Sequence, residues 1–152
     1  MGLDMYLSKK TYIGNHWETE VAQVKLVVPE THRYGQFINA IKPERISEIV
    51  ERVGYWRKAN HIHAWFVKNV QDGRDECQEH YCTEEKLQEL LDTVNTVLAD
   101  HSRAEELLPT QDGFFFGNTD YDEYYFKDLE HTKEILETAL KEGGDFYYHS
   151  SW

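Results

Sequence analysis

The chain has 152 residues, of which 40% are hydrophobic and 29% are charged. This length and composition predict one globular domain over residues 1–152, and they exclude an intrinsically disordered chain. Sixteen basic residues against 28 acidic residues give a formal net charge of −12. Such a charge disfavours direct binding to nucleic acid or to an anionic membrane surface, because both repel it.

The sequence contains no apolar run near the roughly 18–20 residues that a membrane span needs, and its N-terminus lacks the pattern of a signal peptide. We therefore expect a cytoplasmic protein that does not enter a membrane. The two cysteines, Cys77 and Cys82, lie within one short segment. A disulfide framework is not expected from that placement.

An N-terminal β-hairpin is predicted from two strand-like segments. Residues 3–7 form the first, and residues 21–28 form the second, with hydrophobic side chains at alternate positions. Gly14-Asn15 lies between them, and Pro29 ends the second strand because proline cannot donate to a ladder. Residues 30–42 show no clean period, and no element is predicted there.

A long helix is predicted from Pro43 to about Val70. Proline suits the first turn of a helix, where its missing N–H would have no partner, and Glu44 complements the helix dipole there. Hydrophobic residues recur along the segment at steps of three and four. Asp72-Gly73 supplies the end, so this helix is expected to be central to the core.

The second half of the chain predicts further helices and strands. Thr83 is a suitable N-cap for a strongly amphipathic helix, and Thr119 with Asp122 has the spacing of a capping box. The predicted elements are a strand at 77–82, a helix at 84–99, a helical turn at 102–108, an aromatic strand at 113–117, a helix at 120–142 closed by Gly143-Gly144, and a strand at 145–152. Together these elements predict an α+β fold, in which a small, mainly antiparallel sheet is packed by about three helices (roughly 43–71, 84–99 and 120–142) on one face.

The densest mixture of aromatic and polar side chains lies in residues 55–66. Asn60 and His63 occupy positions where the helical pattern expects hydrophobic residues. Burying such a group without a hydrogen bond costs roughly 1–3 kcal/mol, so both need partners. Either other core groups satisfy them, or they line a pocket and bind a ligand.

The aromatic content, 14% of the chain, is enough to line a pocket in which a nucleotide base is stacked. In that interpretation Arg57, Lys58 or His63 would meet an attached phosphate. The ligand-binding candidates are Trp56, Arg57, Asn60, His63, Tyr147 and Trp152.

No metal, cofactor or complete catalytic set is expected. His61 and His63 are two positions apart, which on a helix directs them away from each other. The run Cys77-x-x-His80-x-Cys82 contains residue types that bind zinc but has no second pair. Ser150 and Ser151 lie beside His149 but lack a nucleophile elbow and a recognisable acid partner.

Four segments, residues 1–7, 55–66, 108–117 and 147–152, together resemble an uncharacterised family of small proteins encoded by tailed phages and their prophages. The similarity extends over nearly the whole chain. It implies a phage gene and the bacterial cytosol, and it assigns no role to any residue.

These observations lead to three hypotheses for function. The first is a non-catalytic counter-defence protein that sequesters a nucleotide-like small signal in an aromatic and polar pocket. The second is an acidic inhibitor that binds a basic host protein, such as a nucleic-acid-binding immune effector. The third is a small nucleotide hydrolase or transferase with His63 or His149 as general base. A homo-oligomer is compatible with all three.

Overall fold

The computed structural model describes residues 2–13, 24, 28, 29, 31–112 and 119–152. The chain separates into two compact units, residues 1–9 with 51–152 and residues 10–50. One domain over residues 1–152 stays a prediction, and each unit is described by itself.

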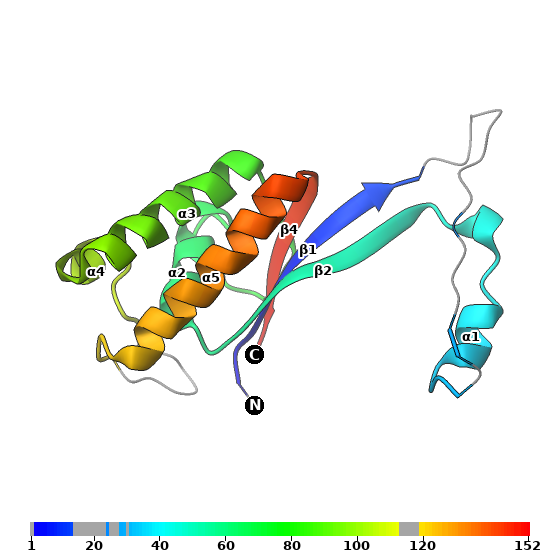
Figure 1. Cartoon of the computed structure of the whole chain (residues 1–152), viewed down its shortest axis with the longest axis horizontal. Helices are drawn as coiled ribbons and strands as arrows, with labels where there is room; N and C mark the ends of the chain where they lie inside the picture. The colour runs from blue at the N-terminus through cyan, green and yellow to red at the C-terminus, as the bar shows by residue number, and fades with distance from the viewer. Residues whose placement is uncertain (1, 14–23, 25–27, 30, 113–118) are drawn as a thin grey trace. The chain divides into compact units, whose positions relative to one another are not determined.

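The fold is α+β, as predicted. Four strands, β1 (Asp4–Tyr12), β2 (Glu48–Arg57), β3 (His80–Cys82) and β4 (Asp145–Ser151), form an antiparallel sheet in the order β2-β1-β4-β3. Residues His80, Tyr81 and Cys82 of β3 pair with Tyr148, Tyr147 and Phe146 of β4. In the first unit, helices α2 (Asn60–Asn69), α3 (Glu84–Ala99) and α5 (Glu123–Glu142) gather on one face of the sheet (Figure 1).

The hydrophobic core of the first unit lies between the sheet and these helices. The sheet contributes the side chains of Met5, Leu7, Trp56, Phe146 and Tyr148. The helices contribute the hydrophobic residues on the faces that they turn toward the sheet and toward one another. Phe66 of α2 stacks on Tyr148 with ring centroids 3.9 Å apart. Phe146 and Tyr148, two residues apart on β4, therefore both belong to the core.

Two of the predicted helices are present near their expected bounds. The α3 helix has the predicted range, and the hydroxyl of Thr83 accepts a hydrogen bond from the N–H of Lys86. The α5 helix begins at Glu123, later than predicted, because the side chain of Asp122 accepts hydrogen bonds from the first turn and is itself the N-cap. Gly143 ends the helix with a φ of 68°, a conformation that favours glycine.

The predicted helix from Pro43 to Val70 is wrong. The segment forms a 3₁₀ turn, η1 (Pro43–Arg45), then the strand β2, and only then the helix α2. Its first part is rich in β-branched and aromatic residues and contains Gly54, which favour a strand over a helix. Lys58 then adopts a φ of 63°, which breaks the chain direction between β2 and α2.

Other predicted elements are present with bounds that differ from the prediction. The first strand extends to Tyr12, the strand before α3 is limited to His80–Cys82, and the predicted helical turn at 102–108 is η2 (His101–Arg103) followed by α4 (Ala104–Leu107). The predicted strand at 113–117 lies outside the described residues. So does the strand at 21–28, apart from Val24 and Val28.

The second unit contains α1 (Gly35–Asn39) and η1 in the described part of residues 10–50. Pro43 starts η1, as its fixed φ allows. The N–H of Ile13 donates to the carbonyl oxygen of Ser47 at 2.8 Å, which joins the two ends of this segment.

Helix α5 approaches the sheet very closely at Gly54 of β2. A Cβ atom placed at Gly54 would lie 2.7 Å from Ile135 Cγ2 and 3.2 Å from Leu7 Cβ. Nearby, the indole N–H of Trp56 donates to Thr132 Oγ1 at 2.9 Å, and that hydroxyl donates to the carbonyl oxygen of Asp128 at 2.6 Å. The absence of a side chain at Gly54 therefore permits α5 to pack closely on β2. The hydrogen bond from Trp56 to Thr132 joins the two elements there.

We expect Gly54→Ala to destabilise the protein by about 1–3 kcal/mol, because the added methyl group overpacks the contact with α5. The loss should be smaller when Gly54→Ala is made in an Ile135→Ala background, which removes the nearest atom. Chemical denaturation of the four proteins of this cycle measures the coupling. Strictly additive losses would contradict the proposed clash.

Candidate functional site

The site is organised around the first turn of α2. The N–H of Lys58 donates to the carbonyl oxygen of Leu3 at 2.9 Å, so the turn before the helix is tied to the start of β1. On the buried side of α2, Ile62 and Phe66 are fully enclosed in the core. His63 follows Ile62 and is 9% exposed, which places a polar ring at the border of that core.

His63 has a hydrogen-bond partner at each ring nitrogen. Its Nδ1 lies 2.7 Å from the hydroxyl of Tyr148, and its Nε2 lies 3.0 Å from Asp75 Oδ2. A carboxylate can only accept, so Nε2 carries the proton and Nδ1 accepts from the phenol when the ring is neutral. This assignment of the tautomer follows from the partners and satisfies every polar group in the set.

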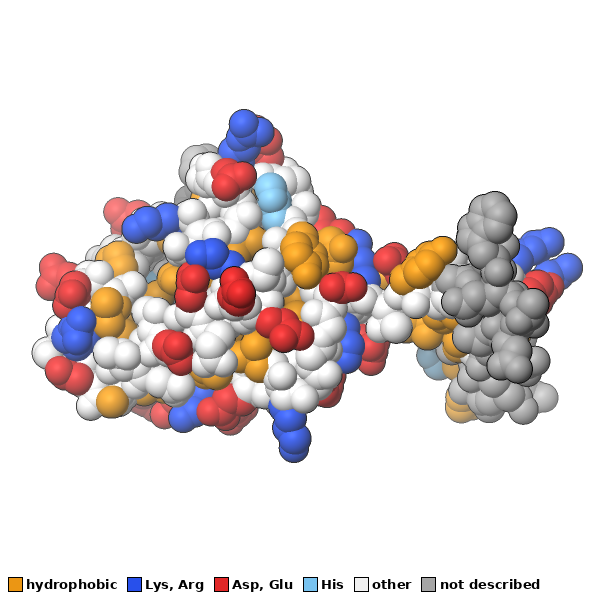
Figure 2. Space-filling view, turned by 90° about the horizontal axis from the view of Figure 1, so that it is seen from above, with side chains coloured by type: hydrophobic (Ala, Val, Ile, Leu, Met, Phe, Trp, Pro, Cys, Tyr) orange, Lys and Arg blue, Asp and Glu red, His pale blue; other side chains and the backbone are white. Residues whose placement is uncertain are grey.

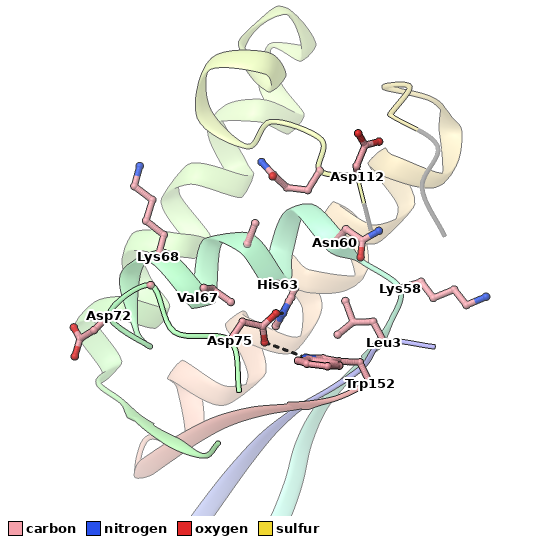
Figure 3. A pocket seen from close by; sticks show the side chains of 13 residues that line it. Leu3, Lys58, Asn60, His63, Val67, Lys68, Asp72, Asp75, Asp112 and Trp152 are labelled. Atoms are coloured by element: carbon pink, nitrogen blue, oxygen red, sulfur yellow. Dashed lines mark hydrogen bonds and ion pairs between the residues drawn. The ribbon is translucent and has the colours of Figure 1, made fainter. Parts of the chain in front are cut away.

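The network continues to the last residue of the chain. The indole N–H of Trp152 donates to Asp75 Oδ1 at 3.1 Å, the contact drawn as a dashed line in Figure 3. Three consecutive hydrogen bonds therefore join Tyr148, His63, Asp75 and Trp152. They link β4 to α2 and to the loop after α2, which are both far from β4 in the sequence.

Tyr148 is the buried end of this network. Its side chain is fully enclosed and stacks on Phe66. Burial, with a smaller contribution from the charge of Asp75, raises the pKa of Tyr148 well above its ordinary value. The phenol therefore stays protonated and acts as a hydrogen-bond donor.

A hollow of about 930 Å³ lies along α2 beside this network. Figure 3 shows Asn60 and Asp112 toward one end of the helix, Lys68 and Asp72 toward the other, and Lys58 extending outward beside Leu3 and Trp152. The lining combines apolar groups with charges of both signs. It consists of Leu3, Lys58, Asn60, His63, Ala64, Val67, Lys68, Asp72, Gly73, Asp75, Gln111, Asp112 and Trp152.

We call this hollow of about 930 Å³ the first hollow. Three of the six ligand-binding candidates, Asn60, His63 and Trp152, line it. The other three lie elsewhere. Trp56 is buried in the core at 2% exposure, and Arg57 is an exposed residue at the end of β2 that does not line the hollow. Tyr147 alternates with Tyr148 along β4 and packs its ring edge-on against Tyr81 at 5.4 Å.

Two important members of the network, Asp75 and Tyr148, were not among the sequence candidates. Tyr148 belongs to the aromatic strand that the sequence predicts, and its place in the core follows from alternation along that strand. Asp75 lies in a loop with no periodic pattern, next to Asp72-Gly73. No signal in the sequence distinguishes it from the other acidic residues of the chain.

A second hollow of about 410 Å³ adjoins the first and shares Lys58, Asn60 and Gln111 with it. The hydroxyl of Tyr125 donates to the carbonyl oxygen of Leu108 at 2.8 Å, which ties the segment that carries Gln111 to α5. The remaining lining residues of the second hollow are His61, Thr110, Asp120, Asp122, Tyr124, Tyr125 and Asp128.

His61 is buried beside Tyr125, with ring centroids 4.4 Å apart. Burial lowers the pKa of His61 from 6.5 to about 4, so its ring is neutral at pH 7. Among the described residues, no hydrogen-bond partner meets its Nε2.

Within the described part of the chain, no three His, Cys, Asp or Glu side chains are arranged to hold a metal ion. Cys77 and Cys82 are not joined in a disulfide. Burial raises the pKa of the Cys82 thiol to about 12, so this side chain is an unreactive thiol within the core. No described helix combines the length and the hydropathy required to cross a membrane.

Comparison of the chain with family models, with curated proteins and with solved structures gave no match. The resemblance to a phage-encoded family therefore stays a prediction.

We expect Tyr148→Phe to lower the free energy of unfolding by about 1–3 kcal/mol, because it leaves Nδ1 of the buried His63 without its donor. Tyr124→Phe is the matched control, since it removes the same atom from a tyrosine that is 75% exposed, and it should cost less than about 0.5 kcal/mol. Denaturant titration measures both. Equal effects of the two substitutions would contradict the importance of the network.

The buried His61 should make the protein sensitive to acid. Because its pKa is lower in the folded protein than in the unfolded chain, the unfolded chain binds more protons between pH 6.5 and about 4. Stability is therefore lost as the pH falls through this range, by about 3 kcal/mol for this one group. His61→Phe should remove that part of the pH dependence, and His32→Gln, which alters an exposed histidine, should keep it. Denaturant titrations at several pH values measure the difference, and parallel curves for wild type and His61→Phe would contradict it.

Proposed function

We propose that the protein is a non-catalytic binding protein that holds a small nucleotide-like molecule in the first hollow. The observation that supports this most strongly is the environment of His63. The histidine lines the hollow, yet both of its ring nitrogens are engaged by other side chains of the protein. Its ring is therefore held in one orientation, which suits it to shaping a binding surface.

The polar and aromatic groups of the hollow suit a planar ligand with hydrogen-bonding edges. Trp152 is 48% exposed, and its indole N–H is held by Asp75, which fixes the plane of the ring and leaves ring surface for stacking. The amide of Asn60, which lines the hollow, contains the donor and acceptor groups that recognise the edge of a base. Lys58 and Lys68 are the cationic groups of a lining that also contains Asp72, Asp75 and Asp112, and an attached phosphate would lie at one of the two lysines.

The catalytic hypothesis has less support at this site. A general base needs a nitrogen that can reach the substrate, whereas the nitrogens of His63 lie 2.7 and 3.0 Å from Tyr148 and Asp75. The phenol of Tyr148 is enclosed, and its raised pKa makes it a poor nucleophile. A hydrolase or transferase would require groups beyond these.

We further propose that binding serves phage counter-defence in the bacterial cytosol, by sequestering a signal of the host. This part rests on the resemblance to phage-encoded proteins.

The inhibitor hypothesis has one supporting observation of its own. Residues 10–50 contain five basic and five acidic residues, so the net charge of −12 comes from the rest of the chain. That charge would attract a basic host protein. Figure 2, however, shows acidic and basic side chains interspersed over the face in view, with hydrophobic groups between them, whereas a mimic of a nucleic acid presents rows of like charge.

We expect a panel of nucleotides and cyclic nucleotides to contain a compound that raises the thermal stability of the protein. A ligand at 100 times its Kd stabilises by about 2.7 kcal/mol, which a thermal-shift assay detects readily. Trp152→Ala should weaken binding of that compound at least tenfold, because it removes the stacking surface. Tyr81→Ala, which truncates an aromatic residue exposed to a similar degree outside the hollow, should leave the affinity unchanged.

Mass spectrometry of the released compound completes the test, since a binding protein returns it unaltered. A chemically changed compound would favour the enzyme hypothesis instead. If no nucleotide shifts the melting temperature and the protein captures a basic host protein in a salt-sensitive manner, the inhibitor hypothesis replaces the one proposed here.

A further inference from the structure

The charges around the first hollow limit the ligand that it can hold. Its lining contains two lysines, Lys58 and Lys68, and three aspartates, Asp72, Asp75 and Asp112. The lining therefore has no excess of positive charge, and the whole chain has a formal net charge of −12. Each further negative charge on a ligand is consequently opposed by the field of the protein.

The two lysines lie at different ends of the hollow. Lys58 precedes α2 by two residues, and Lys68 belongs to the last turn of that helix. The 10 residues of α2 span about 15 Å, at 1.5 Å per residue. In Figure 3, Lys68 lies with Asp72 toward one end of α2, whereas Lys58 lies at the other end, beside Leu3 and Trp152. One phosphate group therefore meets one lysine only.

Lys58 is positioned by the residues at the start of the chain. Its backbone N–H donates to the carbonyl oxygen of Leu3 at 2.9 Å, and a Cβ atom placed at Gly2 would lie 3.2 Å from Lys58 Cε. The stem of the lysine thus lies against the residues just before β1. A base stacked on Trp152 would have Lys58 beside it rather than Lys68.

Two carboxylates accompany Lys58 at this end of the hollow. Asp75 accepts hydrogen bonds from the indole N–H of Trp152 at 3.1 Å and from Nε2 of His63 at 3.0 Å, so its charge stays next to the stacking surface. Asp112 lies toward the N-terminal end of α2 (Figure 3). One phosphate group can be matched by Lys58, whereas further phosphate groups would meet these two carboxylates.

We infer that the ligand of the first hollow is a nucleotide with a single phosphate group, whose phosphate lies at Lys58 and whose base stacks on Trp152. The assignment rests on the proposed function and narrows it to one class of compounds, the nucleoside monophosphates and their cyclic forms. Nucleoside diphosphates and triphosphates lie outside this class, because their additional charges would be placed among Asp75 and Asp112. Lys68, at the far end of α2, has no part in holding the phosphate.

Isothermal titration calorimetry of the whole protein with a series of differently charged compounds tests this assignment. The series consists of adenosine, its 3′,5′-cyclic monophosphate, its 5′-monophosphate and its 5′-triphosphate, and it is repeated with guanosine, cytidine and uridine. For the base that binds, both monophosphates should bind about fivefold or more tightly than the nucleoside, because Lys58 meets the phosphate. The triphosphate should bind about tenfold or more weakly than the 5′-monophosphate, with and without Mg²⁺, because the carboxylates repel it.

Matched variants locate the phosphate. Lys58→Gln should weaken binding of the monophosphate about five- to tenfold and change the affinity for the nucleoside less than about twofold. Lys68→Gln, an equal change of charge at the other end of the hollow, should change both affinities less than about twofold. Asp112→Asn should strengthen binding of the triphosphate about threefold or more, whereas Glu130→Gln, an equal change of charge on the exposed side of α5, should not. Circular dichroism checks that each variant is folded.

A triphosphate that binds as tightly as the monophosphate, or a nucleoside that does so, would overturn the assignment and leave the proposed function in place. Equal losses of monophosphate binding in Lys58→Gln and Lys68→Gln would overturn it as well. Absence of binding by every compound of the series would instead overturn the proposed function, and the assignment with it. The two failures are therefore distinguishable.

Discussion

The hydrogen-bond chain from Tyr148 through His63 and Asp75 to Trp152 determines how the polar and apolar parts of this protein meet. Its inner end is a phenol enclosed in the core and stacked on Phe66, and its outer end is an indole that is half exposed. Each of its three bonds is between 2.7 and 3.1 Å long. A buried imidazole without hydrogen-bond partners is costly. This hydrogen-bond network therefore allows His63 to lie at the border of the core and to line the first hollow.

The same network fixes side chains that line the first hollow. The hydrogen bonds at both nitrogens of His63 hold its ring in one orientation, while the carboxylate of Asp75 orients Trp152 over the hollow. A rigid aromatic surface beside amide and charged groups is a common arrangement for recognising a planar ligand. The second hollow, by contrast, is lined by the neutral ring of His61 and by Asp128, whose pKa is raised to about 6 by burial.

The close contact between α5 and β2 positions the helix that contributes to the lining of the second hollow. Gly54 permits the contact, and the indole of Trp56 is bonded to Thr132 across it. These interactions explain why Trp56, the most prominent aromatic residue of its segment, is committed to the core. Its hydrogen bond to α5 also fixes the helix whose first turns carry Asp122, Tyr124 and Asp128 into the second hollow.

Local signals in the sequence determined much of the fold, including α3 with its Thr83 cap, most of α5 with its glycine end, the strand at the C-terminus and the α+β class. These elements depend on periodicity and capping within a few residues of each other. The segment from Pro43 to Val70 could not be predicted this way, because its hydrophobic spacing fits a helix, whereas packing of Gly54 and Trp56 against α5 and a left-handed turn at Lys58 divide it into a strand and a helix. For the site, the sequence singled out Asn60, His63 and Trp152 as polar or aromatic groups needing an explanation. Only the tertiary structure brought Asp75 and Tyr148 to them, since hydrogen bonds between residues up to 85 positions apart leave no pattern along the chain.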